Sequence, residues 1–204
     1  MTILILFLLV LSISGVLLLR RNRTIAFIMI LLPFLFVFTT WLYLEQNSNR
    51  AVNIPKPPSE SQINIFICEN NLKPLAIRNI GDTFTVILHE NKTEMGYYSL
   101  SIDNRDRVST HATITNNNAN ITPVSIGGNA TGIPFATVII NDQKILENSH
   151  EITVKFEDGY EVTELVNNRK GIIIPNETVK NSNVGLESVC INDHSGKLLF
   201  NCNY

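Results

Sequence analysis

Residue types that commonly bind metals come close together near the C-terminal end of the chain, where three residues separate Cys190 from His194. A blue-copper site needs two histidines, a cysteine and usually a methionine near one another. No methionine is near Cys190, and a dinuclear copper site would need a second cysteine where Leu186 stands. The other histidines occur singly, at positions 89, 111 and 150. We therefore predict neither a metal nor another cofactor; the alternative is a metal site formed by histidines that the fold brings together.

Groups suited to catalysis are present but form no recognisable arrangement. The acidic pairs that are close in sequence, Asp103 with Asp106 and Glu157 with Asp158, occur in turn-like segments, where acidic residues are common. No serine–histidine–aspartate or cysteine–histidine set can be placed along the chain. We therefore predict that the protein is not an enzyme, and a hydrolase has the least support.

The glycine-rich segment 125–132, SIGGNATG, is the remaining candidate for a binding motif. A phosphate-binding loop places its glycines at the start of a helix, whose N-terminus binds the anion. Here Ile133 and Pro134 follow, and then a run of residues typical of a strand. We predict a plain loop between two strands.

Cys190 and Cys202 flank the last predicted hairpin, whose turn contains Gly196. With a three-residue turn and Gly196 in the left-handed conformation, the two cysteines would face each other. In an oxidising compartment we expect a disulfide, which would contribute about 3 kcal/mol by closing a loop of roughly a dozen residues. Two unrelated buried thiols are the alternative. Cys68 is either a small buried hydrophobic residue or the true partner of one of them.

Within residues 62–204, four asparagines begin the N-glycosylation motif Asn-x-Thr and lie at or near predicted loops, as glycan acceptors should. Chance alone produces some of these motifs in a chain rich in asparagine and threonine. The candidates are Asn91, Asn120, Asn129 and Asn176.

The segment that decides how these residues are displayed is 25–44, IAFIMILLPFLFVFTTWLYL. It contains no charged residue, and as a helix it would reach about 30 Å, the thickness of the hydrocarbon core of a bilayer. Trp41 and Tyr43 lie at its end, where aromatic residues meet the membrane surface. We predict a transmembrane helix.

A second apolar span, residues 3–19, precedes it, and Arg20, Arg21 and Arg23 fill the short gap between the two. A cleaved signal peptide is the alternative, but no charge precedes Ile3 and no A-x-A pattern follows. The short gap predicts a helical hairpin, and the positive-inside rule places its arginines in the cytoplasm. Ser12 and Gly15 would offer a face of small residues for helix packing.

We divide the chain into a transmembrane helical hairpin (residues 1–44), a polar, proline-rich linker (45–61) and an extracytoplasmic domain (62–204). In the domain, residues 63–67 alternate between apolar and polar types, apart from Phe66, and further short β-rich runs follow. The Glu157-Asp158-Gly159 turn is a strong hairpin signal. The runs are 83–89, 97–103, 108–115, 135–140, 151–156, 160–166, 187–192 and 197–201.

In the order of its strands and the residue types of its turns, the domain resembles the immunoglobulin-like or adhesion-type sandwiches of cell surfaces. The resemblance covers residues 62–204 and is architectural, because the only tryptophan lies in the second span and the Cys…Trp…Cys core is missing. It implies an all-β, antiparallel immunoglobulin-like β-sandwich outside the cytoplasmic membrane.

The 204 residues carry a formal net charge of −2, which gives no reason to expect a nucleic-acid partner. We therefore expect a non-enzymatic, membrane-anchored protein that acts by protein–protein interaction, as an accessory subunit of a membrane complex or a component of the cell envelope. Its partners would be membrane lipid and other membrane protein subunits, and the sequence does not indicate whether it binds a small-molecule ligand. The alternative is a metal- or ligand-binding ectodomain that serves a redox or transport enzyme.

Overall fold

The structure is a computed structural model, and it describes residues 35, 37–41, 55–116, 122–180 and 182–204. Contacts divide the chain into two units, Met1–Asn53 and Ile54–Tyr204. In the first unit, residues 35 and 37–41 are helical, whereas the span 3–19, most of the span 25–44, Ser12 and Gly15 lie outside the described residues. The part of the chain that the structure describes contains no helix long and apolar enough to cross a membrane.

The second unit begins with a helix where alternation predicted a strand. Helix α3 spans Glu60–Glu69, and a capping box starts it: the Ser59 side chain accepts a bond from the backbone N–H of Gln62, and Gln62 accepts one from Ser59. Its residues Ile63, Phe66 and Ile67 have helical spacing and share one apolar cluster. The strand prediction for 63–67 is therefore wrong. The apolar side chains of this segment pack on one face of a helix. The described end of the predicted linker is attached to the domain, since Lys56 pairs with Ile102.

Helix α3 packs on the first sheet, in which four antiparallel strands follow one another in chain order. On the central strand β2, Ile87 faces the helix, whereas Val86 and Leu88 belong to the cluster on the opposite face. The strands are β1 (Pro74–Ile80), β2 (Phe84–Glu90), β3 (Glu94–Ile102) and β4 (Val108–Asn116).

The second sheet has the order β10-β7-β5, with β5 (Val124–Asn129), β7 (Phe135–Ile140) and β10 (Gly171–Pro175). Every residue of β7 and β10 is buried, and the nearly continuous apolar run 135–140 is typical of such a central strand. The predicted loop 125–132 is wrong, because β5 and the short strand β6 (Thr131–Gly132) occupy it. Strand β6 pairs with β11 (Ser182–Asn183).

The third sheet has the order β13-β12-β8-β9. The predicted Asp158-Gly159 hairpin between β8 and β9 is confirmed, with Gly159 at φ 83°. A short helix, α4 (Gln143–Asn148), joins β7 to β8. The strands are β8 (Glu151–Phe156), β9 (Glu161–Leu165), β12 (Leu186–Asn192) and β13 (Leu198–Asn203).

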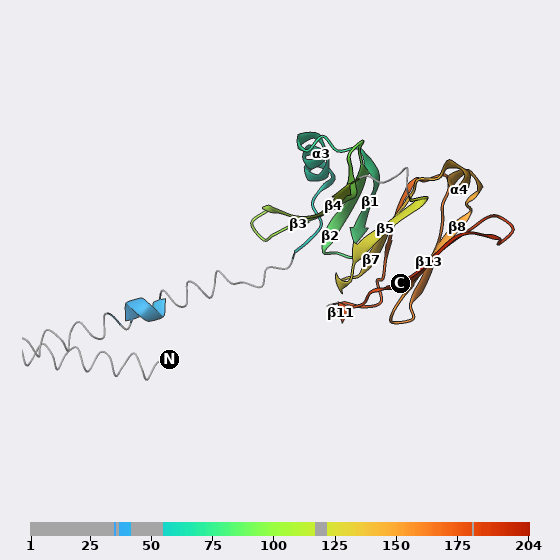
Figure 1. The fold of residues 1–204 in the computed structure, drawn as a ribbon. Coiled ribbons are helices and arrows are strands. Elements are labelled where there is room, and N and C mark those ends of the chain that lie inside the picture. Colours follow the sequence, from blue (N-terminus) through green and yellow to red (C-terminus); the bar gives the residue numbers. More distant parts are fainter. Residues whose placement is uncertain (1–34, 36, 42–54, 117–121, 181) are drawn as a thin grey trace, which may run out of the picture. The chain divides into compact units, whose positions relative to one another are not determined.

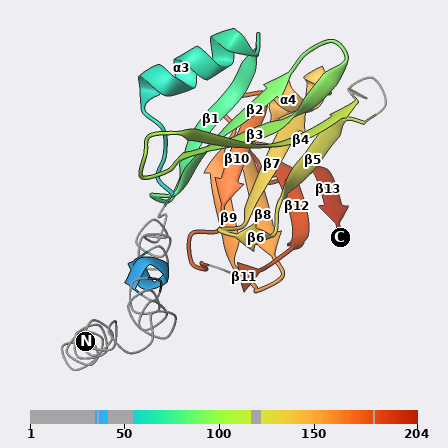
Figure 2. The same ribbon diagram turned by 90° about the vertical axis from the view of Figure 1, so that its left-hand side faces the viewer.

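The domain is therefore an antiparallel β-sandwich in which three sheets stack (Figures 1 and 2). One face of the middle sheet packs on the first sheet through Phe135, Ile139 and Ile173. The other face packs on the third sheet through Val138, Ile172 and their neighbours. The predicted antiparallel β-sandwich is confirmed, and its middle sheet is covered on both sides because its central strands are buried on both faces.

Arg78 connects the three sheets at their edges. From β1 its guanidinium donates to the backbone oxygen of Ile173 on β10 at 2.8 Å, and it also forms an ion pair with Glu164 on β9. Lys170 forms a second such pair, with Glu90 at the end of β2. These polar contacts link the edges of the layers beside the apolar packing between them.

His89 on β2 is buried, with 1 % of its surface exposed, and its ring stacks on Tyr98 with the centroids 5.2 Å apart. Its Nε2 atom is buried without a hydrogen-bond partner among the described residues. Burial lowers the pKa of His89 from 6.5, against a smaller opposing effect of the Glu94 carboxylate. The folded domain therefore holds this imidazole neutral.

We expect the domain to lose stability as the pH falls below about 6.5, because the unfolded chain then binds a proton that folded His89 does not. The loss should level off below the lowered pKa of His89. The measurement is urea unfolding at several pH values, from about one unit above to about two units below the free histidine pKa of about 6.5.

The control is His89→Phe, which keeps a ring against Tyr98 and removes the proton site. The variant should show a flatter stability profile over the same range. Asp103 does not interfere, because hydrogen bonds from the backbone and side chain of Arg107 hold its pKa at about 2, so it affects stability only below about 3.8. An unchanged slope in His89→Phe would contradict this account.

Candidate functional site

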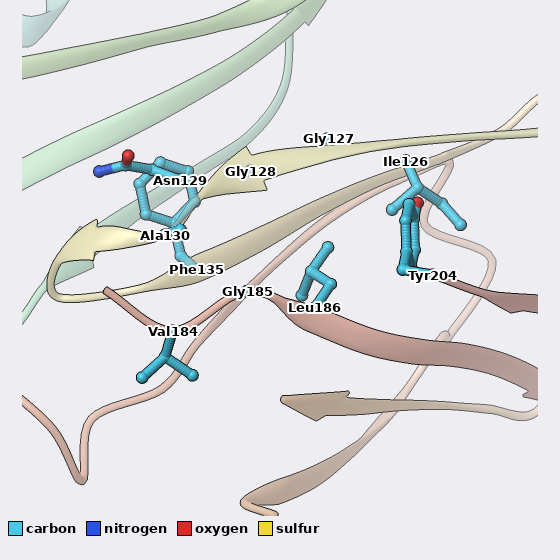
Figure 3. Close-up of a pocket in the computed structure, with 10 residues that line it drawn as sticks. All are labelled: Ile126, Gly127, Gly128, Asn129, Ala130, Phe135, Val184, Gly185, Leu186 and Tyr204. Carbon is cyan, nitrogen blue, oxygen red and sulfur yellow. The ribbon is translucent and has the colours of Figure 1, made fainter. Parts of the chain in front are cut away.

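An apolar cleft of about 270 Å³ lies between the end of β5 and the segment that leads into β12 (Figure 3). Its walls are the side chains of Ile126, Phe135, Val184, Leu186 and Tyr204, with the backbone of the glycines on β5 and Gly185. None of the lining side chains is charged. Partial burial and the nearby Cys202 thiol raise the pKa of Tyr204 to about 12, and its phenol is neutral at physiological pH. The cleft therefore suits an uncharged, apolar group.

One wall of the cleft is the backbone of an edge strand. Strand β5 is the last strand of the middle sheet, and among the described residues no strand pairs with its outer edge. Such an edge presents N–H and C=O groups that an extended segment of another chain can pair with. At its end, the Gly128 carbonyl accepts a bond from the Tyr97 hydroxyl at 2.9 Å, which fixes β5 to β3.

The glycines of β5 are required by the close approach of the neighbouring strand. A Cβ atom on Gly128 would lie 2.1 Å from the carbonyl oxygen of Phe135, and the residue has φ 154°. Gly127 is exposed and has no side chain to cover the edge. The glycine pair that suggested a loop in the sequence thus produces a bare, reachable strand edge beside an apolar cleft.

Tyr204 and Leu186 complete the cleft from the third sheet. The backbone N–H of Tyr204 donates to the carbonyl of Glu187, and the Tyr204 ring lines the cleft together with Ile126 (Figure 3). The tyrosine is 66 % exposed, whereas Leu186 and Ile126 are half-buried and pack against the core cluster between the second and third sheets. The cleft is therefore a surface extension of the core rather than an enclosed cavity.

The predicted disulfide is not formed, because Cys190 and Cys202 are free and lie on opposite faces of the β12–β13 hairpin. Cys190 pairs with Asn201, whereas Cys202 pairs with Val189. Gly196 has φ 80°, as predicted, but the register differs by one residue from that prediction and shifts again near Asn192, at a bulge. Cys68 is also free and is exposed rather than buried.

We expect Cys190→Ser and Cys202→Ser, singly or together, to change the free energy of unfolding by less than about 1 kcal/mol, since neither thiol closes a loop. Urea unfolding with and without a reducing agent gives the measurement. A loss of about 3 kcal/mol in both the double variant and the reduced wild type would show that the two cysteines do form a disulfide.

The described glycosylation candidates differ in exposure. Asn91 is exposed in the turn between β2 and β3, and Asn129 is half-buried at the end of β5. Asn176 is fully buried, and its amide nitrogen donates to Asp158 at 2.9 Å, so the folded domain has no room for a glycan there. Asn176 is therefore excluded as an acceptor in the folded protein. Asn120 lies outside the described residues.

Two of the four histidines come together. The rings of His150, before β8, and His194, in the β12–β13 turn, stack with their centroids 4.0 Å apart. Within the described residues, no group of three or more histidine, cysteine or acidic side chains is placed to hold a metal ion. The pair by itself provides two ligands, fewer than a structural or catalytic zinc site uses.

Sequence reasoning missed the apolar cleft. Its side chains come from β5, β7, the start of β12 with the segment before it, and the residue after β13, and no local pattern links them. The glycine pair at 127–128 was the only available signal. Comparison of the chain with protein-family models, curated proteins and solved structures finds no match.

Proposed function

We propose that the chain is a non-enzymatic, membrane-anchored protein whose β-sandwich binds another protein outside the cytoplasmic membrane. Residues 1–44 form the anchor, a transmembrane hairpin with spans 3–19 and 25–44 and the arginines of the gap in the cytoplasm. One transmembrane helix would be enough to anchor the domain at the membrane. The second span therefore supports a role as an accessory subunit of a membrane complex. In this setting Ser12 and Gly15 pack against neighbouring helices, and Asn91 and Asn129 are available to glycosylation.

The observation that carries the proposal is the uncharged cleft beside the open edge of β5. An extended segment of a partner subunit pairs its backbone with β5 and places an apolar side chain between Ile126 and Leu186. This mode of recognition uses main-chain hydrogen bonds for affinity and the pocket for specificity. The partner segment is uncharged at its central position, because a buried charge would have no counter-ion among the lining residues.

Native electrophoresis of mild-detergent membrane extracts tests the proposal. The wild-type protein is expected to migrate in a complex larger than its own mass. Replacing Ser12 and Gly15 with leucine should weaken the complex while leaving membrane insertion intact, because small residues allow close helix packing. A wild-type protein that runs alone at its own mass would point to a free-standing component of the cell envelope instead.

A ligand-binding ectodomain that serves a redox or transport enzyme is the second candidate function. The observation that favours it is the stacked pair His150–His194, which could supply two ligands to a metal together with water or a partner's side chain. Titration of the purified protein with Zn²⁺ and Cu²⁺ separates the two functions. Binding that is lost in His194→Ala would favour the second.

A further inference from the structure

A second cleft, of about 340 Å³, lies at the end of the gap between the first sheet and β6. On β3, the side chains that face the middle sheet change from the buried Met95 and Tyr97 to Ser99 and Ser101. On β4, His111 pairs with Ser99, and Ser109 pairs with Ser101. The inner face of the sheet is thus apolar in the core and lined by hydroxyl groups where it reaches solvent.

The hydroxyl groups of this cleft are available to a ligand. Among the described residues, the side chains of Thr83, Ser99, Ser101 and Ser109 have no hydrogen-bond partner, and neither has His111. Some other hydroxyls of the domain bond to neighbouring side chains, as Thr85 does to Asn79 at 2.7 Å. A concave surface that collects unpaired donors and acceptors from separate strands is suited to a ligand rich in hydrogen-bonding groups.

The remaining lining residues narrow the chemistry of that ligand. The cleft contains no lysine, arginine, aspartate or glutamate, so it offers no counter-charge to an anion or a cation. Phe84, half-buried on β2, supplies an aromatic wall, and Pro55 is a further lining residue. An apolar ligand would leave the hydroxyls without partners, which is costly. A neutral molecule with many hydroxyls and one apolar face satisfies both kinds of wall.

We propose that this hydroxyl-lined cleft binds a neutral saccharide, with a sugar ring against Phe84 and its hydroxyls bonded to Ser99, Ser101 and Ser109. The volume is near the lower end of the roughly 300–1,000 Å³ usual for small-molecule sites, which suits a mono- or disaccharide. The inference does not rest on a protein partner, although Asn129 lines both this cleft and the apolar cleft.

The sugar has two possible sources, because Asn129 also lines this cleft and begins a glycosylation motif with Thr131. The Asn129 side chain accepts from the Thr131 hydroxyl at 3.0 Å and donates to the Thr131 carbonyl at 2.8 Å, which holds it at the rim. A glycan on Asn129 would supply its first sugar to the cleft from the same chain. A free saccharide would enter from solvent.

The test uses the full chain in mild detergent and the methyl glycosides of glucose, galactose, mannose and N-acetylglucosamine, with binding detected by saturation-transfer NMR. At least one glycoside is expected to bind. The double variant Ser99→Ala/Ser101→Ala should weaken it about tenfold, since it removes two hydrogen bonds of modest strength. Ser188→Ala on β12, outside the cleft, is the matched control and should bind as the wild type does.

The variant Asn129→Gln identifies the source. Equal binding by wild type and Asn129→Gln indicates a free saccharide. Binding only by Asn129→Gln, together with a glycan on wild-type Asn129 by mass spectrometry, indicates that the chain's own glycan fills the cleft. The proposal is overturned if no glycoside binds to either protein, or if binding is unchanged in the double serine variant while its unfolding midpoint matches that of the wild type.

Discussion

Replacing Leu186 with arginine is expected to release the protein from its partner complex. Leu186 is central in the uncharged cleft beside β5, and a guanidinium there would fill the space proposed for the partner's apolar side chain. Truncating or blocking a central contact of an interface commonly costs about 2 kcal/mol or more, roughly thirtyfold in Kd. The measurement is the fraction of the protein that migrates in the complex on native electrophoresis.

The matched control is Leu198→Arg, at an exposed leucine on β13 that does not line the cleft. Because Leu186 also packs against the core, the unfolding midpoints of both variants must be compared. Tyr204→Ala removes the exposed wall of the cleft and should weaken the complex without that complication. A complex that survives both Leu186→Arg and Tyr204→Ala would mean that partners bind elsewhere.

Phe135→Ala should cost about 3–5 kcal/mol of unfolding free energy, the usual range for a buried phenylalanine. Phe135 is 1 % exposed, and its ring contacts Tyr97 edge-on with the centroids 5.1 Å apart. It also lines the apolar cleft, so its loss opens a cavity between the first two sheets and widens the cleft. Against a total stability of about 5–15 kcal/mol, this single change is expected to threaten folding.

Urea unfolding followed by circular dichroism measures the effect. Phe200→Ala on β13 is the control, because Phe200 is half-buried and should cost less than half as much. A loss below about 1 kcal/mol for Phe135→Ala would contradict the packing of the first sheet on the second through this ring.

Much of the β-sandwich could be predicted from local patterns. The continuous apolar run 135–140 required burial on both faces, and β7 is the middle strand of the middle sheet. Gly159 and Gly196 adopt the positive φ that their turns predicted. These features depend on neighbouring residues alone, which is why the sequence was sufficient.

The errors arose where contacts distant in sequence decide the structure. Residues 63–67 alternate imperfectly between apolar and polar types, but they form a helix. The capping box at Ser59 starts this helix, and its apolar side chains cover Ile87. The strand β10, GIIIP, was not predicted, although it completes the middle sheet between the outer two. Its burial depends on partners contributed by all three sheets.

The candidate sites could not be predicted for the same reason. The register of β12 with β13 differs by one residue from the predicted one, and this difference moves Cys190 and Cys202 to opposite faces. The two clefts are built from side chains on separate strands, and only the glycines of β5 and the Asn129 motif marked them in the sequence.

Site-specific photo-crosslinking in intact membranes tests the central claim most directly. A benzophenone amino acid replaces Tyr204, whose exposed ring lines the apolar cleft, and a second protein carries it at Leu198 as the control. The account predicts a discrete adduct between position 204 and another membrane protein, absent from position 198 and lost when Leu186→Arg is added. No adduct from position 204, or the same adducts from both positions, would contradict the proposal that this cleft binds a partner.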